Sequence, residues 1–336
     1  MEYIQQFLSL TDRPAFCTED GIVTAVNAAA RIRQIQPGDR LESLLDSGSE
    51  ALSEFGQGFL SLTVNLCGNS YPATVTALNR QLLFTLEPEE AAEDFRLLTL
   101  ASQSLREPLS DVMALVEQLD ADPEQLAGIN RGLHRLLRLI GNMAPHPTPK
   151  MELLDVNELL RELWDKVQPA CECRNIPFRF TPSPTPVYSC VDADLINRAI
   201  YNLLSNAIKF SGGGAIAMQL SQRRRFYQIT LQDTGSALPE LGQDPFSRFL
   251  REPGLEDPRW GTGLGMRLVR STALAHGGTV LMDEPPEGGV RVTLSLPMQQ
   301  NPTGLRSPRL QVSYTGERDP MLVELSDILP TEFYKK

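Results

Sequence analysis

The sequence lacks the features that mark several classes of protein. No apolar run approaches the roughly 18–20 residues that cross a bilayer. The first residues, MEYIQQFLSLTDRP, have neither the basic start nor the small-residue cleavage site of a signal peptide. The five cysteines are odd in number and thinly spread, which does not suit a disulfide framework. These absences predict a cytoplasmic protein with no membrane span.

Positive charge is also scarce. The 336 residues carry 31 Lys and Arg against 42 Asp and Glu, a net charge of −11. Direct nucleic-acid binding relies on basic patches, so we expect no nucleic-acid partner. A hydrophobic fraction of 41% is that of a folded globular protein, and the length suits about two domains.

Residues 1–87 have a mixed α/β pattern. A short amphipathic helix is expected over 3–10 and another over 27–34. Between them, Glu19-Asp20-Gly21 predicts a hairpin turn that joins two strands. Three further strands are expected in 60–66, 71–78 and 80–88, so this region predicts a small α/β domain.

Residues 88–145 have the pattern of a helical hairpin. Pro88 and the acids after it suit a helix start, and Asp122 with Pro123 suits the start of a second helix. The second helix has one apolar face, formed by Leu126, Ile129, Leu133, Leu136, Ile140 and Met143. A lone hairpin cannot bury such stripes, so we predict a dimeric four-helix bundle. Packing of the hairpin on a neighbouring domain is the alternative.

After a Pro-rich linker, residues 151–299 alternate helices and strands as one α/β unit, and 300–336 form a tail. The tail pattern predicts a strand over 310–314 and a short helix over 321–329, with no evident role. The whole chain is therefore expected to be an α+β multidomain protein.

Three groups of residues in 192–289 carry chemistry. Asn202 and Asn206 share a helix face with Lys209 one turn on, and amide oxygens are suitable Mg²⁺ ligands. Asp233 ends a strand and can accept a hydrogen bond from an amine such as that of adenine. Gly235 follows and allows close backbone approach.

The third group is glycine-rich. Gly261, Gly263 and Gly265 precede an apolar helix, where backbone N–H groups suit polyphosphate. It is neither a Walker loop nor a dinucleotide fingerprint. The long loop before it, 236–260, contains Phe246 and Phe249 and has the composition of a lid over a ligand.

The order and spacing of these groups resemble the ATP-binding domain of sensor histidine kinases, an α/β sandwich shared with chaperone and mismatch-repair ATPases (the GHKL superfamily). Asn202-Leu-Leu-Ser-Asn206-Ala-Ile-Lys209 resembles the N-box, and Asp233-Thr-Gly235 the first glycine box. Phe246-Ser-Arg-Phe249 resembles the F-box, and Gly261-Thr-Gly-Leu-Gly265 the second glycine box.

The resemblance implies ATP and Mg²⁺ as cofactors. It implies that Asn206 holds Mg²⁺, that Asn202 and Lys209 support the phosphates, and that Asp233 reads adenine. The hydrolysing relatives carry a general-base Glu at the place of Asn202, which takes no proton at neutral pH, so simple ATP hydrolysis does not fit. The family's second glycine of the first box is Ala237 here.

The predicted hairpin resembles the family's dimerisation hairpin with one decisive difference. Its Ser102-Gln-Ser-Leu-Arg-Glu-Pro-Leu109 matches the acceptor box in its proline and apolar positions, but Gln103 stands at the acceptor histidine. The adjacent acid of the box is Ser104, and Glu107 replaces the family's Thr. A glutamine amide nitrogen has no nucleophilic lone pair, so phosphoryl transfer to Gln103 is excluded.

The opening of the chain has its own resemblance. PAFCTEDGIVTAVNAAAR, residues 14–31, resembles the strand–turn–strand–helix start of PAS sensory domains. We therefore expect a PAS-containing homodimer that binds Mg-ATP and acts as a regulatory scaffold for a response regulator or another kinase.

Two alternatives stay open. One is a working phosphotransferase that uses His134, Ser102, Ser104 or a partner's histidine as acceptor. The other is an interaction module whose ATP site is vestigial.

Overall fold

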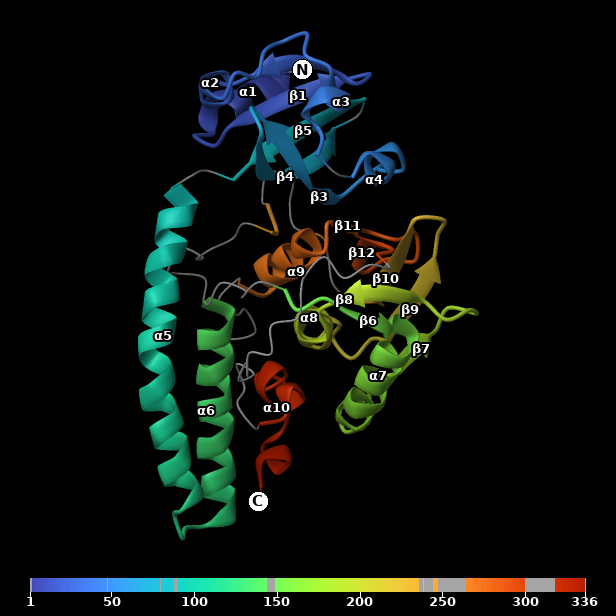
Figure 1. Cartoon of the computed structure of the whole chain (residues 1–336). Coiled ribbons are helices and arrows are strands. Elements are labelled where there is room, and N and C mark those ends of the chain that lie inside the picture. The colour runs from blue at the N-terminus through green and yellow to red at the C-terminus, as the bar shows by residue number, and fades with distance from the viewer. Residues whose placement is uncertain are drawn as a thin grey trace.

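The computed structural model describes residues 2–46, 48–78, 80–87, 90–143, 149–235, 238, 244–246, 264–299 and 318–335. Figure 1 shows an N-terminal sheet at the top, a long helical hairpin that extends below it, and a second sheet with its helices beside the hairpin. In the part of the chain so described, no helix combines the length and apolar character that a bilayer span requires.

Five antiparallel strands form the N-terminal sheet in the order β2-β1-β5-β4-β3. The predicted strands and the hairpin at Asp20 and Gly21 are confirmed, and both turn residues have positive φ. The strands are β1 Ala15–Glu19, β2 Ile22–Val26, β3 Phe59–Leu66, β4 Asn69–Leu78 and β5 Gln81–Leu86, with helices α1 Glu2–Leu10, α2 Ala28–Ile32, α3 Leu41–Leu44 and α4 Ser49–Ser53.

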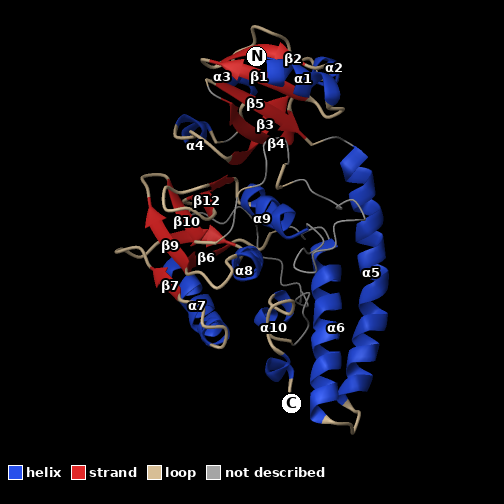
Figure 2. Ribbon diagram, turned by 180° about the vertical axis from the view of Figure 1, so that it is seen from behind, coloured by secondary structure: helices blue, strands red, loops and turns tan. Residues whose placement is uncertain are grey.

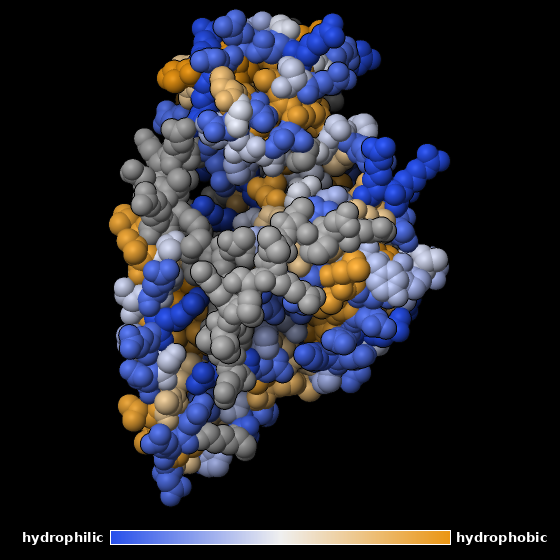
Figure 3. All heavy atoms as spheres, viewed as in Figure 1, coloured by the Kyte–Doolittle hydropathy of each residue, from blue (hydrophilic) through white to orange (hydrophobic). Residues whose placement is uncertain are grey.

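The predicted helical hairpin consists of α5 Glu90–Glu117 and α6 Pro123–Met143. Its buried seam joins Leu109, Met113 and Val116 of α5 to Leu133, Leu137 and Ile140 of α6. The buried stripe of α6 differs from the predicted one, because Ile129 and Leu136 are exposed. Figure 3 shows hydrophobic side chains along the outer edge of the hairpin. Further apolar side chains are exposed in α5 and just after it: Leu97, Leu100, Leu105, Val112, Leu115 and Leu119.

The second sheet has the order β11-β12-β10-β9-β7, and only the β7–β9 pair is parallel. In β9, Ile216, Met218 and Leu220 are buried, whereas Ala217 and Gln219 are exposed, so one face is covered. Its elements are α7 Val156–Glu172, β7 Phe178–Thr181, α8 Ala193–Phe210, β9 Ile216–Gln222, β10 Phe226–Asp233, α9 Leu264–Ala275, β11 Thr279–Asp283 and β12 Arg291–Pro297, beside a separate pair, β6 Glu152–Asp155 with β8 Tyr188–Val191.

The two sheets are continuous. Strand β3 pairs antiparallel with β11, with Leu60 opposite Leu281, so one sheet of ten strands runs through both parts (Figure 2). The junction also has an ion pair of 3.1 Å between Arg270 of α9 and Glu87, just after β5. Hydrogen bonding from Thr74 of β4 to Asp244 adds a third contact. The sequence did not predict this junction.

The C-terminal tail lies between α6 and α8 (Figure 1). Its helix α10 Pro320–Glu324 is shorter than the predicted one, since turns follow it, and a 3₁₀ helix, η1 Thr331–Tyr334, comes next. Asp319 caps α10 by accepting a hydrogen bond from the N–H of Met321. The strand predicted over 310–314 lies outside the described residues.

Candidate functional site

Helix α8 carries the first group of predicted site residues. Asp192 starts the helix by accepting a hydrogen bond from the N–H of Leu195. Asn202 is buried, with 1% of its surface exposed, whereas Asn206 and Lys209 are partly exposed farther along the helix. Among the described residues, no hydrogen bond engages the Asn206 amide, so none of them blocks its oxygen from a ligand.

Every polar atom of the Asn202 side chain is engaged. Its Oδ1 accepts from Arg138 Nη2 at 3.0 Å. Its Nδ2 donates to the carbonyl oxygen of Arg198 and to Glu324 Oε2, at 2.9 and 3.0 Å. The residue is therefore clamped between the hairpin, through Arg138, and the tail, through Glu324.

Lys209 is paired with the tail as well. Its Nζ lies 2.7 Å from Asp327 Oδ2, and Arg138 Nη1 lies 2.7 Å from the same oxygen. Burial lowers the pKa of Lys209, and Asp327 opposes that shift. Burial acts to raise the pKa of Asp327, but the charges of Arg138 and Lys209 bring it below its ordinary value. The Asp327 carboxyl is thus ionised near neutral pH.

Asp233 and Gly235 form a turn at the end of β10. Asp233 is buried, and its Oδ1 accepts from the N–H of Gly235 at 3.0 Å. A Cβ at Gly235 would overlap the carbonyl oxygen of Ser211, which caps α8. The absence of a side chain at Gly235 thus allows the two backbone segments to lie close together, and this contact joins the turn to the end of the helix that carries Lys209.

The second glycine group is only partly described. Gly265 lies in the first turn of α9, where an added Cβ would come within 3.0 Å of Asn202 Oδ1. Phe246 is fully buried in the core of this part. Phe249, Gly261, Gly263 and Ala237 lie outside the described residues. The start of α9 is thus placed against the α8 face that carries Asn202.

Sequence reasoning missed the charged residues of this cluster, namely Arg138, Arg198, Glu324 and Asp327. Glu324 has no exposed surface, and Arg138 and Arg198 are also buried. A signal was present, because Arg138 interrupts the apolar run RLLRLIG and Glu324 interrupts MLVEL. A charge inside an apolar stripe needs a partner, but the sequence does not say which.

The residues fit an anionic ligand. Lys209 and Arg138 direct donors at carboxylate oxygens, and carboxylates and phosphates are recognised by the same donors. The free amide oxygen of Asn206 suits Mg²⁺, which prefers oxygen ligands. The set therefore fits a phosphate-bearing ligand with its metal, although tail carboxylates now engage part of it.

The acceptor region of α5 is arranged differently. Gln103 is exposed. Ser102 Oγ donates to the carbonyl of Thr99 at 2.8 Å, and Ser104 Oγ donates to that of Leu100 at 3.0 Å. Both hydroxyl protons are thus held by the helix backbone, which leaves neither serine hydrogen-bonded to a general base.

His134 is buried on α6. Its Nδ1 lies 2.7 Å from the carbonyl oxygen of Asn130, and its ring meets that of Tyr334 edge-on at 5.1 Å. Burial lowers its pKa, and the contact with Asn130 opposes this shift. The tail therefore covers this histidine in the described conformation.

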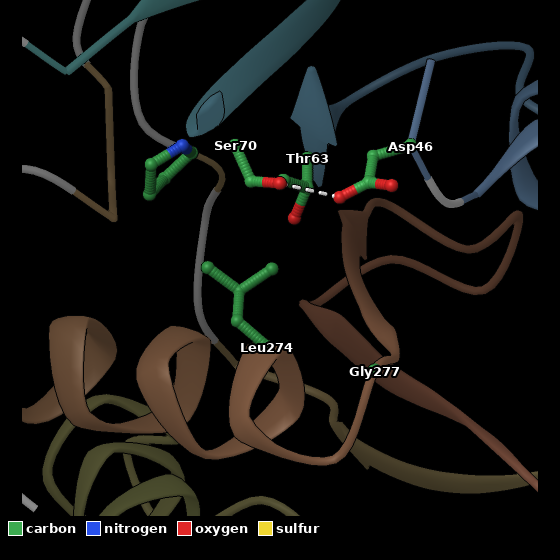
Figure 4. Close-up of a pocket in the computed structure, with 6 residues that line it drawn as sticks. Asp46, Thr63, Ser70, Leu274 and Gly277 are labelled. Carbon is green, nitrogen blue, oxygen red and sulfur yellow. Dashed lines mark hydrogen bonds between the residues drawn. The ribbon is translucent and has the colours of Figure 1, made fainter. Parts of the chain in front are cut away.

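A separate cleft of about 520 Å³ lies where the two sheets join (Figure 4). Its walls include Leu274 and Gly277 at the far end of α9. Because α9 has 12 residues, about 18 Å, this cleft is at the opposite end of the helix from Asn202. Asp46 in its wall accepts a hydrogen bond of 2.6 Å from Ser70, so this carboxylate already has a partner.

Residues 191–300 match the family model for histidine kinase-, DNA gyrase B-, and HSP90-like ATPases. The hybrid signal transduction histidine kinase D of Dictyostelium discoideum is 29% identical over 222 residues, which cover 60% of this chain and 14% of that protein. The sensor-like histidine kinase SenX3 of Mycolicibacterium smegmatis is 28% identical over 219 residues, covering 60% of this chain and 56% of that protein. The match therefore spans at most 56% of either relative.

Solved structures are also similar to part of the chain. The ATP binding domain of PrrB from Mycobacterium tuberculosis is 26% identical and covers 45% of this chain and 99% of that chain, with a TM-score of 0.37.

Proposed function

Because this chain belongs to the sensor histidine kinase family, we propose that it binds Mg-ATP and acts as a nucleotide-dependent regulatory scaffold, not as an autophosphorylating kinase. One observation carries the proposal: Asn206, Lys209 and Asp233 are retained while Gln103 stands at the acceptor position. The chain thus keeps the groups for binding nucleotide and lacks the group that would receive the phosphoryl.

In this proposal, different residues of the site contact different parts of the nucleotide. Asn206 offers its amide oxygen to the Mg²⁺ that neutralises the phosphates. Lys209 and the N–H groups at the start of α9 face the phosphate charge. The Asp233 carboxylate accepts from the exocyclic amine of adenine, while its Oδ1 stays bonded to the N–H of Gly235.

Two alternatives are less well supported. Transfer to Ser102, Ser104 or His134 requires an activated, accessible acceptor, and these groups are held by backbone carbonyls or covered by the tail. Transfer to a histidine of a partner protein stays compatible with the site. A vestigial ATP site would not explain why Asn206, Lys209 and Asp233 are all present.

The other parts of the chain have roles in the same proposal. Residues 1–87 act as a PAS-like sensory domain, which the sheet order β2-β1-β5-β4-β3 and the helices between β2 and β3 support. Residues 88–145 form the dimerisation hairpin, residues 151–299 the ATP-binding domain, and a response regulator or another kinase is the partner.

The test is nucleotide binding by the full chain and by Asp233→Asn, measured by calorimetry with a non-hydrolysable ATP analogue and Mg²⁺. The asparagine oxygen would still accept the hydrogen bond from the N–H of Gly235. Its NH₂ group would then face the adenine amine, and two donors cannot form a hydrogen bond with each other. We expect affinity to fall at least about tenfold, since a lost hydrogen bond to a charged group is worth about 1.5–3 kcal/mol. The control Asp165→Asn, on the exposed side of α7, should bind as the wild type does.

The scaffold role is tested in the same sample with γ-labelled Mg-ATP. A chain that binds nucleotide and takes up no label supports the proposal. Acid-labile label would indicate phosphohistidine and point to His134, and acid-stable label would point to Ser102 or Ser104. An absence of nucleotide binding in the wild type would instead support the vestigial site.

A further inference from the structure

The C-terminal tail brings two carboxylates onto the α8 face that carries Asn202 and Lys209. Glu324 contacts Arg198 Nε at 3.0 Å, Arg138 Nε at 3.4 Å and Asn202 Nδ2 at 3.0 Å. Asp327 contacts Lys209 Nζ at 2.7 Å. The chain therefore supplies its own anions to the donors that a polyphosphate would use.

The tail is held there as a packed element. Its carbonyl oxygens at Ser326 and Asp327 accept hydrogen bonds from Arg131 and Arg135 of α6, between 3.1 and 3.3 Å. Tyr334 Oη donates to the carbonyl of Leu322 at 2.7 Å and so closes the segment on itself. The buried apolar side chains of residues 318–335 are Met321, Val323, Leu325, Ile328, Leu329 and Tyr334.

We propose that residues 318–335 are an internal competitor of the nucleotide, and that docking of this tail and binding of the ATP phosphates exclude one another. The inference rests on the proposed binding of Mg-ATP. The competition follows from saturation: both polar groups of Asn202 are engaged, and the Lys209 ammonium is bonded to Asp327. A phosphate can reach these donors only after the carboxylates leave, because like charges repel in a partly buried site.

The competition couples the nucleotide to the hairpin. Arg138 bridges the tail and Asn202, and Arg131 and Arg135 hold the tail backbone, so release of the tail breaks the tail contacts of three arginines of α6. It also uncovers His134, whose ring lies against Tyr334. Because linkage is reciprocal, whatever stabilises the docked tail weakens nucleotide binding by the same factor.

The test compares Mg-dependent binding of a non-hydrolysable ATP analogue to the full-length wild type and to Glu324→Gln/Asp327→Asn. The two substitutions keep the side-chain shapes and remove the competing charges. Affinity should rise about tenfold or more, because the apparent affinity of a site scales with the fraction of molecules in which it is open. The single variant Asp327→Asn, at a less buried carboxylate, should move the same way if the double variant does not fold.

A matched control separates competition from the change in net charge. Glu332→Gln lies in the same tail and removes one negative charge, as the single variant Asp327→Asn does. Its side chain is exposed and outside the cluster, so affinity should not change. Hydrogen exchange gives a readout without substitution. The N–H groups of Val323 and Leu325, bonded within the tail, should exchange faster when the analogue is bound.

The outcomes are distinct. Tighter binding by the charge-removed variants, with the control unchanged, supports the competitor. Equal or weaker binding by those variants, or tail exchange that does not respond to bound analogue, overturns the competitor and leaves the proposed nucleotide binding intact. If neither the wild type nor any variant binds the analogue, the proposed function fails and this inference fails with it.

Discussion

At the residue scale, sequence spacing located the groups on one element and missed those that meet across elements. Asn202 and Lys209 were found because both lie on one helix at a regular spacing. Arg138 and Glu324 were not, since they lie 64 and 122 residues from Asn202, with which both form hydrogen bonds. The apolar periodicity indicates that a charge is buried and needs a partner, but the partner's identity depends on the tertiary structure.

Two buried histidines make the stability of the chain depend on pH. His276 Nε2 accepts from the N–H of Asp192 at 3.0 Å, and Nδ1 lies 2.7 Å from the carbonyl of Thr272. Burial lowers the pKa of His276, as it lowers that of His134, although contacts with backbone carbonyls oppose the shift. The unfolded chain therefore takes up protons at a higher pH than the folded chain does.

We expect the free energy of unfolding to be greatest above the unfolded histidine pKa of about 6.5 and to fall as pH drops below it. The slope is at most about 1.4 kcal/mol per pH unit for each histidine. Urea unfolding at pH 7.5, 6.5 and 5.5 measures it. His276→Gln retains a donor and an acceptor and should show a shallower slope, and a slope equal to that of the wild type would contradict this origin.

At the element scale, most helices and strands were predictable because their apolar periodicity is strong. The tail helix ends earlier than predicted because turns follow it. These turns bury Leu325, Ile328 and Leu329, so the apolar residues of 321–329 reach the core without a continuous helix. The pairing of β3 with β11 had no signal, since the alternation of a strand fixes its buried face and not its neighbour along the sheet edge.

The junction of β10 with α8 gives a prediction at this scale. Gly235→Ala would place a Cβ on the carbonyl oxygen of Ser211, which is backbone and cannot swing away. We expect the free energy of unfolding to fall by about 1–3 kcal/mol, as for other overpacked sites, and nucleotide affinity to fall with it. Chemical denaturation and analogue binding measure the two effects.

Gly132→Ala is the matched control for that substitution. Gly132 lies within α6, where an added Cβ meets nothing within 4 Å. Alanine is a better helix former than glycine, so the control should gain up to about 1 kcal/mol. Equal stability for Gly235→Ala and the wild type would show that the turn and the helix end can separate without cost.

At the scale of the whole molecule, the hairpin has two sides with different surroundings. The inner side of α6 packs on the tail and lies near α9. This side therefore behaves as the alternative prediction had it, in which the hairpin packs on a neighbouring domain. The outer side of α5 keeps an apolar seam in which Val112 follows Leu105 at an interval of seven residues, with Leu115 three residues after Val112. This heptad spacing is typical of a helix that packs against another helix.

A second copy of the chain is the occupant that we expect on this seam, as a four-helix bundle. Leu115 has 65% of its surface exposed, and burial of each such side chain contributes about 1.5–3 kcal/mol. Sedimentation equilibrium should therefore give twice the chain mass of 37.3 kDa. Val112→Glu/Leu115→Glu would bury two charges in the seam and should give monomers, whereas Gln118→Glu, at an exposed polar position of the hairpin, should stay dimeric. A monomeric wild type at micromolar concentration would mean that something other than a second copy covers α5.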